Sequence, residues 1–212
     1  MHRGFSGAAS AEAAERLARL ASDEIPHADL AAARDIALPV GTAFHRMMET
    51  WHLTTDPATE LARQREIQHR WLRSSVAFEQ VPGALDRFDL LLDRFRQGQF
   101  MDRFTAMAGN TLAREVSILV PPLDPDSGPV GFITGFIDLL YRHPESGKWI
   151  IVDYKTDRVE DRADIEERAE AYCLQEAVYS QAIQESLNLE QPPTPQLWFI
   201  WPDVLWEDPA AP

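Results

Sequence analysis

The chain has 212 residues, of which 45% are hydrophobic and 25% are charged, as is usual for a folded protein with one main domain. No stretch approaches the roughly 18 consecutive apolar residues of a membrane span, and the N-terminus has no apolar signal segment, so we expect a cytoplasmic protein without membrane contact. The single cysteine, Cys173, excludes an internal disulfide and a four-thiolate iron–sulfur cluster.

The net charge of −14 argues at first sight against a nucleic-acid partner. The charge is unevenly distributed: residues 115–212 carry 19 acidic and 6 basic side chains, whereas residues 61–114 carry 9 basic and 6 acidic ones. We interpret most of the acids, including the run over residues 157–170, as a solvated surface. Clustered carboxylates can also hold metal cations, which reverse the local field. The net charge therefore does not decide the type of partner.

The first half of the chain has the composition and spacing of helices. Ser10 is a suitable N-cap for the first helix, and Asp56 followed by a proline indicates the start of a later one. We expect Pro39 to close an irregular stretch, and Gly98 and Gly109 to stop helices. The predicted helices cover residues 10–20, 41–53, 57–72, 85–95 and 100–108.

The pattern changes near Leu112 to short runs rich in β-branched and aromatic residues, which favour strands. The predicted strands cover residues 116–120, 130–141, 148–154 and 197–201. A long helix over residues 163–189 separates the last two. Helices first, then a three-strand meander, a helix and a returning strand predict a mixed α/β domain of the α+β kind, with a central sheet flanked by helices.

Two of these strands form a hairpin whose register follows from its loop. Residues 144–147 have the composition of a four-residue connection, so the two residues that flank them should pair. The same register puts Asp138 directly opposite Asp153, with Cα atoms about 4.5–5.5 Å apart. Lys155 lies two residues beyond Asp153 and therefore on the same face of its strand.

Two carboxylates and an ammonium group are thus expected on one face of the hairpin. Carboxylates this close repel each other unless one takes up a proton or a cation lies between them. Mg²⁺ prefers oxygen ligands, acidifies a bound water and holds a phosphoryl oxygen, while Lys155 can stabilise the charge that develops. The alternative is an exposed cluster of acids with a lysine salt bridge, which the apolar neighbours of Asp138 and Asp153 disfavour.

The sequence Asp153-Tyr154-Lys155-Thr156-Asp157 resembles the PD-(D/E)XK nucleases, in particular the nuclease domains of RecB and AddA. The resemblance spans roughly residues 41–201. Further motifs of the family occur in its order along the chain: Gly-x-x-x-His-x-x-x-Glu from Gly41 to Glu49, a glutamate that opens the first strand at Glu115, Gly-x-x-Asp from Gly135 to Asp138, and Tyr-x-x-Gln-x-x-x-Tyr from Tyr172 to Tyr179.

The resemblance implies a restriction-endonuclease-like core over residues 41–212, preceded by an N-terminal helical extension over residues 1–40. It implies one or two Mg²⁺ or Mn²⁺ ions, and the metal ligands that it implies are His45, Glu115, Asp138, Asp153 and the carbonyl of Tyr154. The catalytic residues that it implies are Asp138, Asp153, Lys155, Gln175 and Tyr179.

Several of these positions also have simpler interpretations. His45 stands among apolar residues, where a packed histidine is common, and Glu115 could instead be a salt-bridged strand end. The residues of the Tyr-x-x-Gln-x-x-x-Tyr motif share one helix face, where tyrosines are routinely buried. A glutamine such as Gln175 in an apolar stripe needs a hydrogen-bonding partner, which Lys155 or a DNA phosphate would supply.

The sequence has no Gly-x-x-x-x-Gly-Lys-Ser/Thr motif, so we expect no ATP site in this chain, and the missing cysteines exclude the iron–sulfur branch of the family. A DNA helicase, in trans or in the parent polypeptide, would then supply unwinding. The favoured function is a Mg²⁺-dependent deoxyribonuclease, such as an exonuclease, that acts with a helicase on DNA in recombination and repair and prefers single strands.

Two other functions stay open from the sequence. One is a non-catalytic, nuclease-like scaffold that binds a helicase or DNA, and the other is an autonomous endonuclease. Degenerate members of the family usually lose an acid or the lysine, whereas Asp138, Asp153 and Lys155 are all present here. The intact set favours catalysis.

Overall fold

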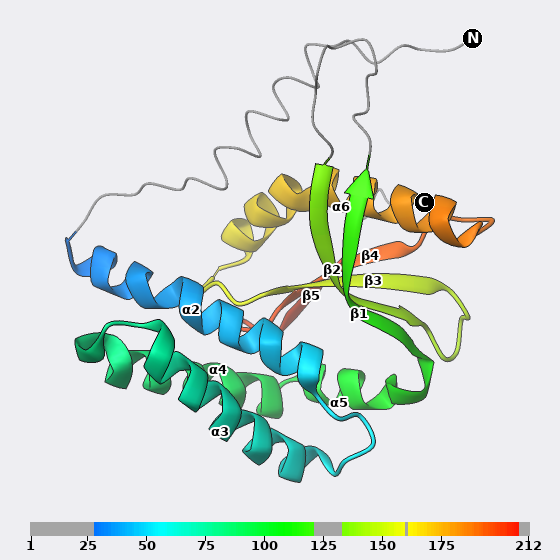
Figure 1. Ribbon diagram of the computed structural model, residues 1–212. Coiled ribbons are helices and arrows are strands. Elements are labelled where there is room, and N and C mark those ends of the chain that lie inside the picture. Colours follow the sequence, from blue (N-terminus) through cyan, green and yellow to red (C-terminus); the bar gives the residue numbers. More distant parts are fainter. Residues whose placement is uncertain (1–27, 121–132, 160, 208–212) are drawn as a thin grey trace.

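The computed structural model of the chain describes residues 28–120, 133–159 and 161–207 (Figure 1). The first predicted helix, over residues 10–20, lies outside the described residues. In chain order the elements are α2 (Ala28–Thr50), α3 (Pro57–Ser75), η1 (Phe78–Gln80), α4 (Val81–Gln97), α5 (Gln99–Ala106), η2 (Ala108–Asn110), β1 (Thr111–Val120), β2 (Ile133–Arg142), β3 (Trp149–Lys155), α6 (Arg162–Leu187), β4 (Thr194–Phe199) and β5 (Val204–Trp206).

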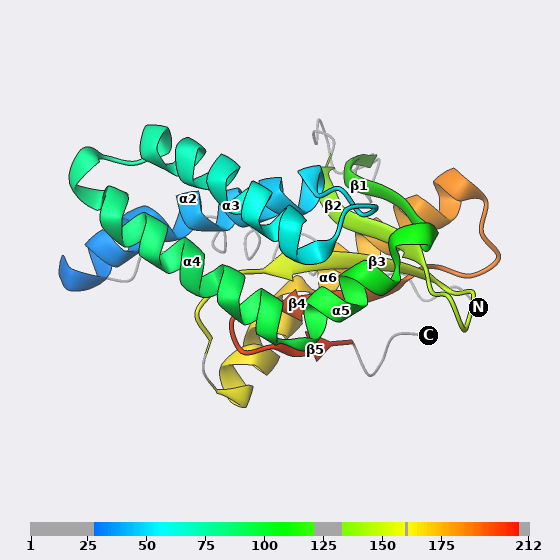
Figure 2. The same cartoon turned by 90° about the horizontal axis from the view of Figure 1, so that it is seen from below.

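The five strands form one mixed sheet in the order β1-β2-β3-β4-β5. β1, β2 and β3 make an antiparallel meander, β4 returns parallel to β3 after α6, and β5 turns back antiparallel to β4. α6 covers one face of the sheet, and the helices α2 to α5 gather on the other (Figure 1 and Figure 2). The predicted fold class, a mixed central sheet flanked by helices, is confirmed.

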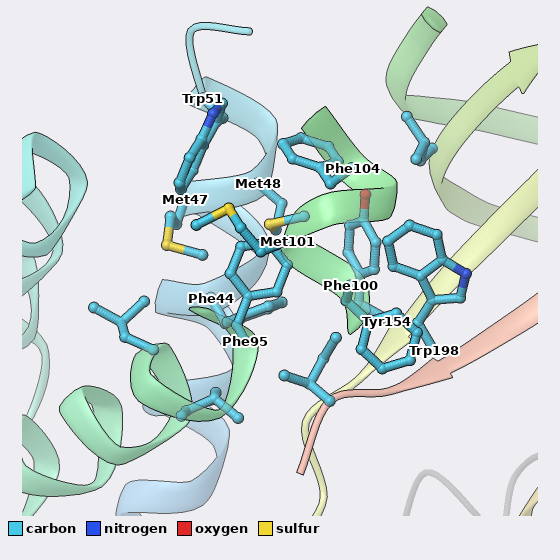
Figure 3. Close-up of a cluster of buried hydrophobic side chains, with 14 of the residues drawn as sticks. Phe44, Met47, Met48, Trp51, Phe95, Phe100, Met101, Phe104, Tyr154 and Trp198 are labelled. Atoms are coloured by element: carbon cyan, nitrogen blue, oxygen red, sulfur yellow. The ribbon is translucent and has the colours of Figure 1, made fainter. Parts of the chain in front are cut away.

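The largest core lies between the sheet and the helices α2, α4 and α5, and aromatic rings fill it (Figure 3). Phe44 of α2 and Trp51, the residue after this helix, both meet Phe95 of α4 edge to face, at centroid distances of 5.5 and 6.1 Å. Phe100 of α5 stacks on Trp198 of β4 at 4.9 Å. Each buried ring removes about 150–250 Å² from water, so this core holds α2 firmly against the sheet.

The course of α2 corrects one prediction. The helix runs without a break through Pro39, so the irregular stretch expected up to that proline is wrong. A proline inside a helix removes one hydrogen bond and commonly costs about 3 kcal/mol. The alanine-rich sequence before it favours a helix, and three residues just after it are buried, which offsets the cost: Val40, Ala43 and Phe44. The proposed division between residues 40 and 41 falls inside this helix.

The other predicted helices and strands occur with shifted ends. α3 starts at Pro57 and is capped by Asp56, whose carboxylate accepts a hydrogen bond from the backbone amide of Thr59 at 2.9 Å. α5 ends at Ala106, before the expected stop at Gly109. Among the described helices, none has the length and apolar character needed to span a membrane.

The short strand β5 was not predicted, and it has a structural role. The turn between β4 and β5 contains Asp203 in a left-handed conformation, with φ 56°. The Asp203 carboxylate accepts a hydrogen bond from the Gln99 amide at 3.0 Å and so caps the start of α5. Gly98 ends α4 as predicted, but with a further reason: a Cβ there would lie 2.3 Å from Asp203 Oδ1.

A buried polar network caps the C-terminal end of α2. Glu60 of α3 is fully buried and accepts hydrogen bonds from Arg63 Nε, the His52 amide and Gln64 Nε2 at 2.8, 2.9 and 3.0 Å. Gln64 also donates to the carbonyl of Thr50, the last residue of the helix, at 2.9 Å. Burial by itself would raise the pKa of Glu60, but these hydrogen bonds outweigh it and lower the pKa to about 2.

The network predicts how stability depends on pH. Because the folded-state pKa of Glu60 lies below its ordinary value of 4.5, its contribution should be complete above about pH 4.5 and lost as the pH falls toward 2. Glu60→Gln should unfold at a lower temperature at pH 7 and lose less on acidification than the wild type. Thermal unfolding between pH 7 and pH 3 measures both effects. Glu66→Gln removes an exposed acid of the same helix and should leave the profile unchanged; identical profiles for both variants would contradict the prediction.

Candidate metal and catalytic site

Three side chains from three elements converge beside the sheet: His45 of α2, Glu115 of β1 and Asp138 of β2. Each offers one ligand atom, and these atoms lie within 4.8 Å of one another. His45 Nδ1 is 2.9 Å from Asp138 Oδ1. Burial by itself would lower the pKa of His45, but its hydrogen bond to Asp138 and the charges of the neighbouring carboxylates raise it. The site therefore attracts positive charge.

The predicted hairpin register is confirmed by the pairs that flank the site. Leu139 pairs with Val152, which leaves Asp138 and Asp153 as the next facing residues. The regular backbone pairing stops there. The Tyr154 amide donates its hydrogen bond to a side chain instead, Asp138 Oδ2, at 2.6 Å. A buried carboxylate thus lies where the pairing of β2 and β3 ends.

Asp153 and Lys155 form the second half of the site, on the α6 side of β3. Lys155 Nζ lies 2.6 Å from Asp153 Oδ2, as the spacing of two residues predicts. Burial raises the pKa of Asp153, Asp138 adds to the rise, and Lys155 opposes it. Asp153 is outside the three-residue cluster, but it is close enough to Asp138 for the two charges to interact.

Glu115, whose side chain lies beside His45 and Asp138, has an unusual backbone conformation. Its φ is +51°, which a residue with a side chain rarely adopts, and the pairs on either side of it, Arg114 with Leu139 and Val116 with Ile137, leave it out of the ladder. Arg114 also donates hydrogen bonds to two carbonyls at the end of α2, at 2.9 and 2.8 Å, and ties this strand to the helix of His45. Such strain is typical of functional sites.

The pKa of Glu115 reflects its position beside Asp138. Burial and the Asp138 carboxylate raise the pKa of Glu115 to about 7, while His45 opposes the rise. Two carboxyl groups and an imidazole at this distance suit a divalent cation, which would remove the repulsion between the acids. Carboxylate oxygens are ligands of Mg²⁺ and Mn²⁺, so Glu115 and Asp138 fit the predicted ions, and the imidazole of His45 is a ligand typical of transition metals.

The three residues of the α6 motif have different partners. Gln175 Nε2 donates to the Tyr179 hydroxyl at 2.8 Å, so the partner that the glutamine required is a tyrosine of its own helix. The Tyr179 hydroxyl presses on Gly135 of β2, where a Cβ would lie 1.8 Å from it; only glycine fits there. The residue of α6 that meets Lys155 is Tyr172, whose ring centroid is 3.3 Å from Nζ.

Tyr172 is the contact that sequence reasoning missed. Its position on the same helix face as Gln175 was visible, but the spacing could not show which of the two residues reaches Lys155. Tyr154 likewise differs from the expectation in detail: its amide serves the site, and its buried hydroxyl has no hydrogen-bond partner among the described residues. Its carbonyl stays a proposed metal ligand.

Comparison with known proteins agrees with this geometry. The sequence pattern of the PD-(D/E)XK nuclease superfamily matches residues 12–203, which is most of the chain. A curated protein of Lysinibacillus sphaericus, named as an ATP-dependent helicase/nuclease subunit, is 33% identical over 84 residues, 37% of this chain. That match covers 7% of the relative's length, so the chain corresponds to a small part of that protein. The predicted resemblance to the RecB and AddA type is confirmed at this level, and the chain belongs to the PD-(D/E)XK nuclease superfamily.

Proposed function

We propose that the protein is a divalent-metal-dependent deoxyribonuclease that hydrolyses the phosphodiester bonds of DNA, with single strands as its preferred substrate. The observation that carries the proposal is the convergence of His45, Glu115 and Asp138 beside the Asp153–Lys155 pair. This site places candidate metal ligands on one side and the Lys155 ammonium on the other. Metal-assisted hydrolysis of a phosphodiester can use both, because charge develops at the attacked phosphate and at the leaving oxygen.

In this proposal His45, Glu115, Asp138, Asp153 and the Tyr154 carbonyl would hold one or two Mg²⁺ or Mn²⁺ ions. A bound ion acidifies water and draws electron density from the phosphate. Asp138 is oriented by the Tyr154 amide, which leaves its other oxygen facing His45. The Lys155 ammonium lies where it can donate to a phosphate oxygen or align the attacking water. Gln175 and Tyr179 support this face through their hydrogen bond.

The partner that we propose is a DNA helicase, because the similar protein from Lysinibacillus sphaericus carries both helicase and nuclease in its name. The helicase would deliver single strands to the site, in recombination and repair and in the cytoplasm, and the nuclease would act as an exonuclease. Several arginines of residues 61–114 form ion pairs with acids of the same chain, such as Arg63 with Glu60 and Arg65 with Asp89. We expect the phosphate contacts to come mainly from basic groups that are not paired in this way.

The isolated chain should degrade labelled single-stranded DNA in Mg²⁺ or Mn²⁺ without ATP, and EDTA should stop the reaction. The rate at low DNA concentration should fall steeply between about 50 and 200 mM salt, because phosphate contacts release counterions. Intact duplex of the same length is the control substrate and should be degraded only when a helicase opens it.

Two results would redirect the proposal. Efficient cutting of intact duplex at a defined sequence would favour an autonomous endonuclease. No cleavage under any divalent metal, combined with binding to DNA or a helicase, would favour a non-catalytic scaffold and contradict the proposal.

A further inference from the structure

Lys155 is held by two groups of different kinds. Its ammonium lies 2.6 Å from Asp153 Oδ2 and 3.3 Å from the centroid of the Tyr172 ring, so it stands between a carboxylate and an aromatic face. The side chain is only 11% exposed. A lysine side chain is a flexible stem of four carbons and does not fix its ammonium without such neighbours. The ring supplies an attractive surface because the face of an aromatic ring carries partial negative charge.

The two groups do not depend on each other. Asp153 is a proposed metal ligand, and a carboxylate that shares its charge with a cation attracts a neighbouring ammonium less strongly. The attraction of the ring is unaffected by that change, since Tyr172 belongs to α6 and not to the proposed ligand set. The aromatic contact is therefore the one that can keep the ammonium in place when Asp153 is engaged elsewhere.

α6 is anchored so that the Tyr172 ring cannot easily move away. Two turns further along the helix, Tyr179 packs tightly on Gly135 and is hydrogen-bonded to Gln175. On the other side, Tyr172 packs against the buried cluster formed by Val159, Ile165, Ala169, Leu197 and Phe199. The helix is thus fixed to the sheet, and the Tyr172 ring packs on this cluster with its face toward the ammonium.

We propose that Tyr172 is a positioning residue, whose ring face fixes the Lys155 ammonium for transition-state stabilisation. This inference rests on the proposed nuclease function, because it assigns a role within the same site. The ring, and not the hydroxyl, makes the contact, since the ammonium lies over the centroid. Phenylalanine should therefore replace tyrosine, and an aliphatic residue should not.

The first test compares Tyr172→Phe with Tyr172→Leu in single-turnover cleavage of labelled single-stranded DNA. Tyr172→Leu should slow cleavage by ~10- to 100-fold, the usual effect of a misplaced group, and Tyr172→Phe should keep most of the rate. DNA binding in Ca²⁺ should be similar for all. Ile165→Val trims the same buried cluster and controls for loosened packing. Equal rates for wild type and Tyr172→Leu, or a Phe variant as slow as the Leu variant, would overturn the inference.

The second test uses thermal unfolding without metal and needs no activity. If ring and ammonium attract each other, the double variant Tyr172→Leu/Lys155→Met should lose less melting temperature than the two single variants lose together. Additive losses would overturn the contact on which the inference rests. If the melting temperatures show the coupling but the wild type cuts no DNA, the proposed function is refuted and the contact is not. The two failures are therefore distinguishable.

Discussion

Replacement of Lys155 by alanine should lower the single-turnover rate of DNA cleavage by ~10²–10³, while metal and DNA binding change little. An ammonium has no acceptor lone pair and cannot bind a cation, so its loss leaves the metal ligands in place. It lies close to the carboxylates, 2.6 Å from Asp153, where charge on the phosphate would develop. Removing one such preorganised donor commonly costs about 3–4 kcal/mol. Single-turnover cleavage beside a binding titration in Ca²⁺ measures both quantities.

The chain offers a matched control, because it has only two lysines. Lys148 is exposed at the tip of the same hairpin, and Lys148→Ala should cleave at the wild-type rate. Lys155→Arg should recover little activity, since a planar guanidinium differs in shape and donor geometry from an ammonium. If Lys155→Ala and the wild type cleave equally fast, the activity belongs to a contaminant or the proposed mechanism is wrong.

Removal of both carboxylates, in Asp138→Ala/Asp153→Ala, should abolish the response of the melting temperature to Mg²⁺ or Mn²⁺. A ligand that binds only the folded state stabilises it by about 2.7 kcal/mol at a hundred times its dissociation constant, so the wild type should melt at a higher temperature with metal. Without Asp138, the cluster with His45 and Glu115 loses the acid at its centre. Thermal unfolding with and without metal gives the shift for each protein.

The comparison is made within each variant, because the loss of Asp138 also removes its hydrogen bond to the Tyr154 amide and lowers the baseline stability. Asp86→Ala/Asp102→Ala removes two exposed aspartates of α4 and α5 and should keep the full metal-induced shift. An equal shift in the Asp138→Ala/Asp153→Ala protein would eliminate the paired carboxylates as the metal site.

The sequence was most informative where the chemistry is local. The connection at residues 144–147 and the alternation of side chains fixed the hairpin register, and with it the neighbourhood of Asp138, Asp153 and Lys155. The order of the motifs identified the family, which the match over residues 12–203 confirms. Helix propensity and capping located the Asp56 start of α3 for the same reason: each signal acts over a few neighbouring residues.

Local signals did not predict the features of the fold that depend on packing between distant parts of the chain. β5 exists because a three-residue segment pairs with β4, and α2 continues through Pro39 because the residues beyond it are buried in the core. The left-handed backbone of Glu115 has no sequence signature, since a glutamate adopts it only when the surrounding fold imposes it.

By itself, therefore, the sequence determined which acids and which lysine lie on one face of the hairpin, and which superfamily the chain belongs to. Only the tertiary structure decided that His45 reaches Asp138 across 93 residues of chain, and that Tyr172 rather than Gln175 covers Lys155. The physical reason is that periodicity assigns a residue to a face of its own helix or strand. The contacts of that face depend on how the elements pack, and the packing follows from the sum of many weak contacts spread over the whole core.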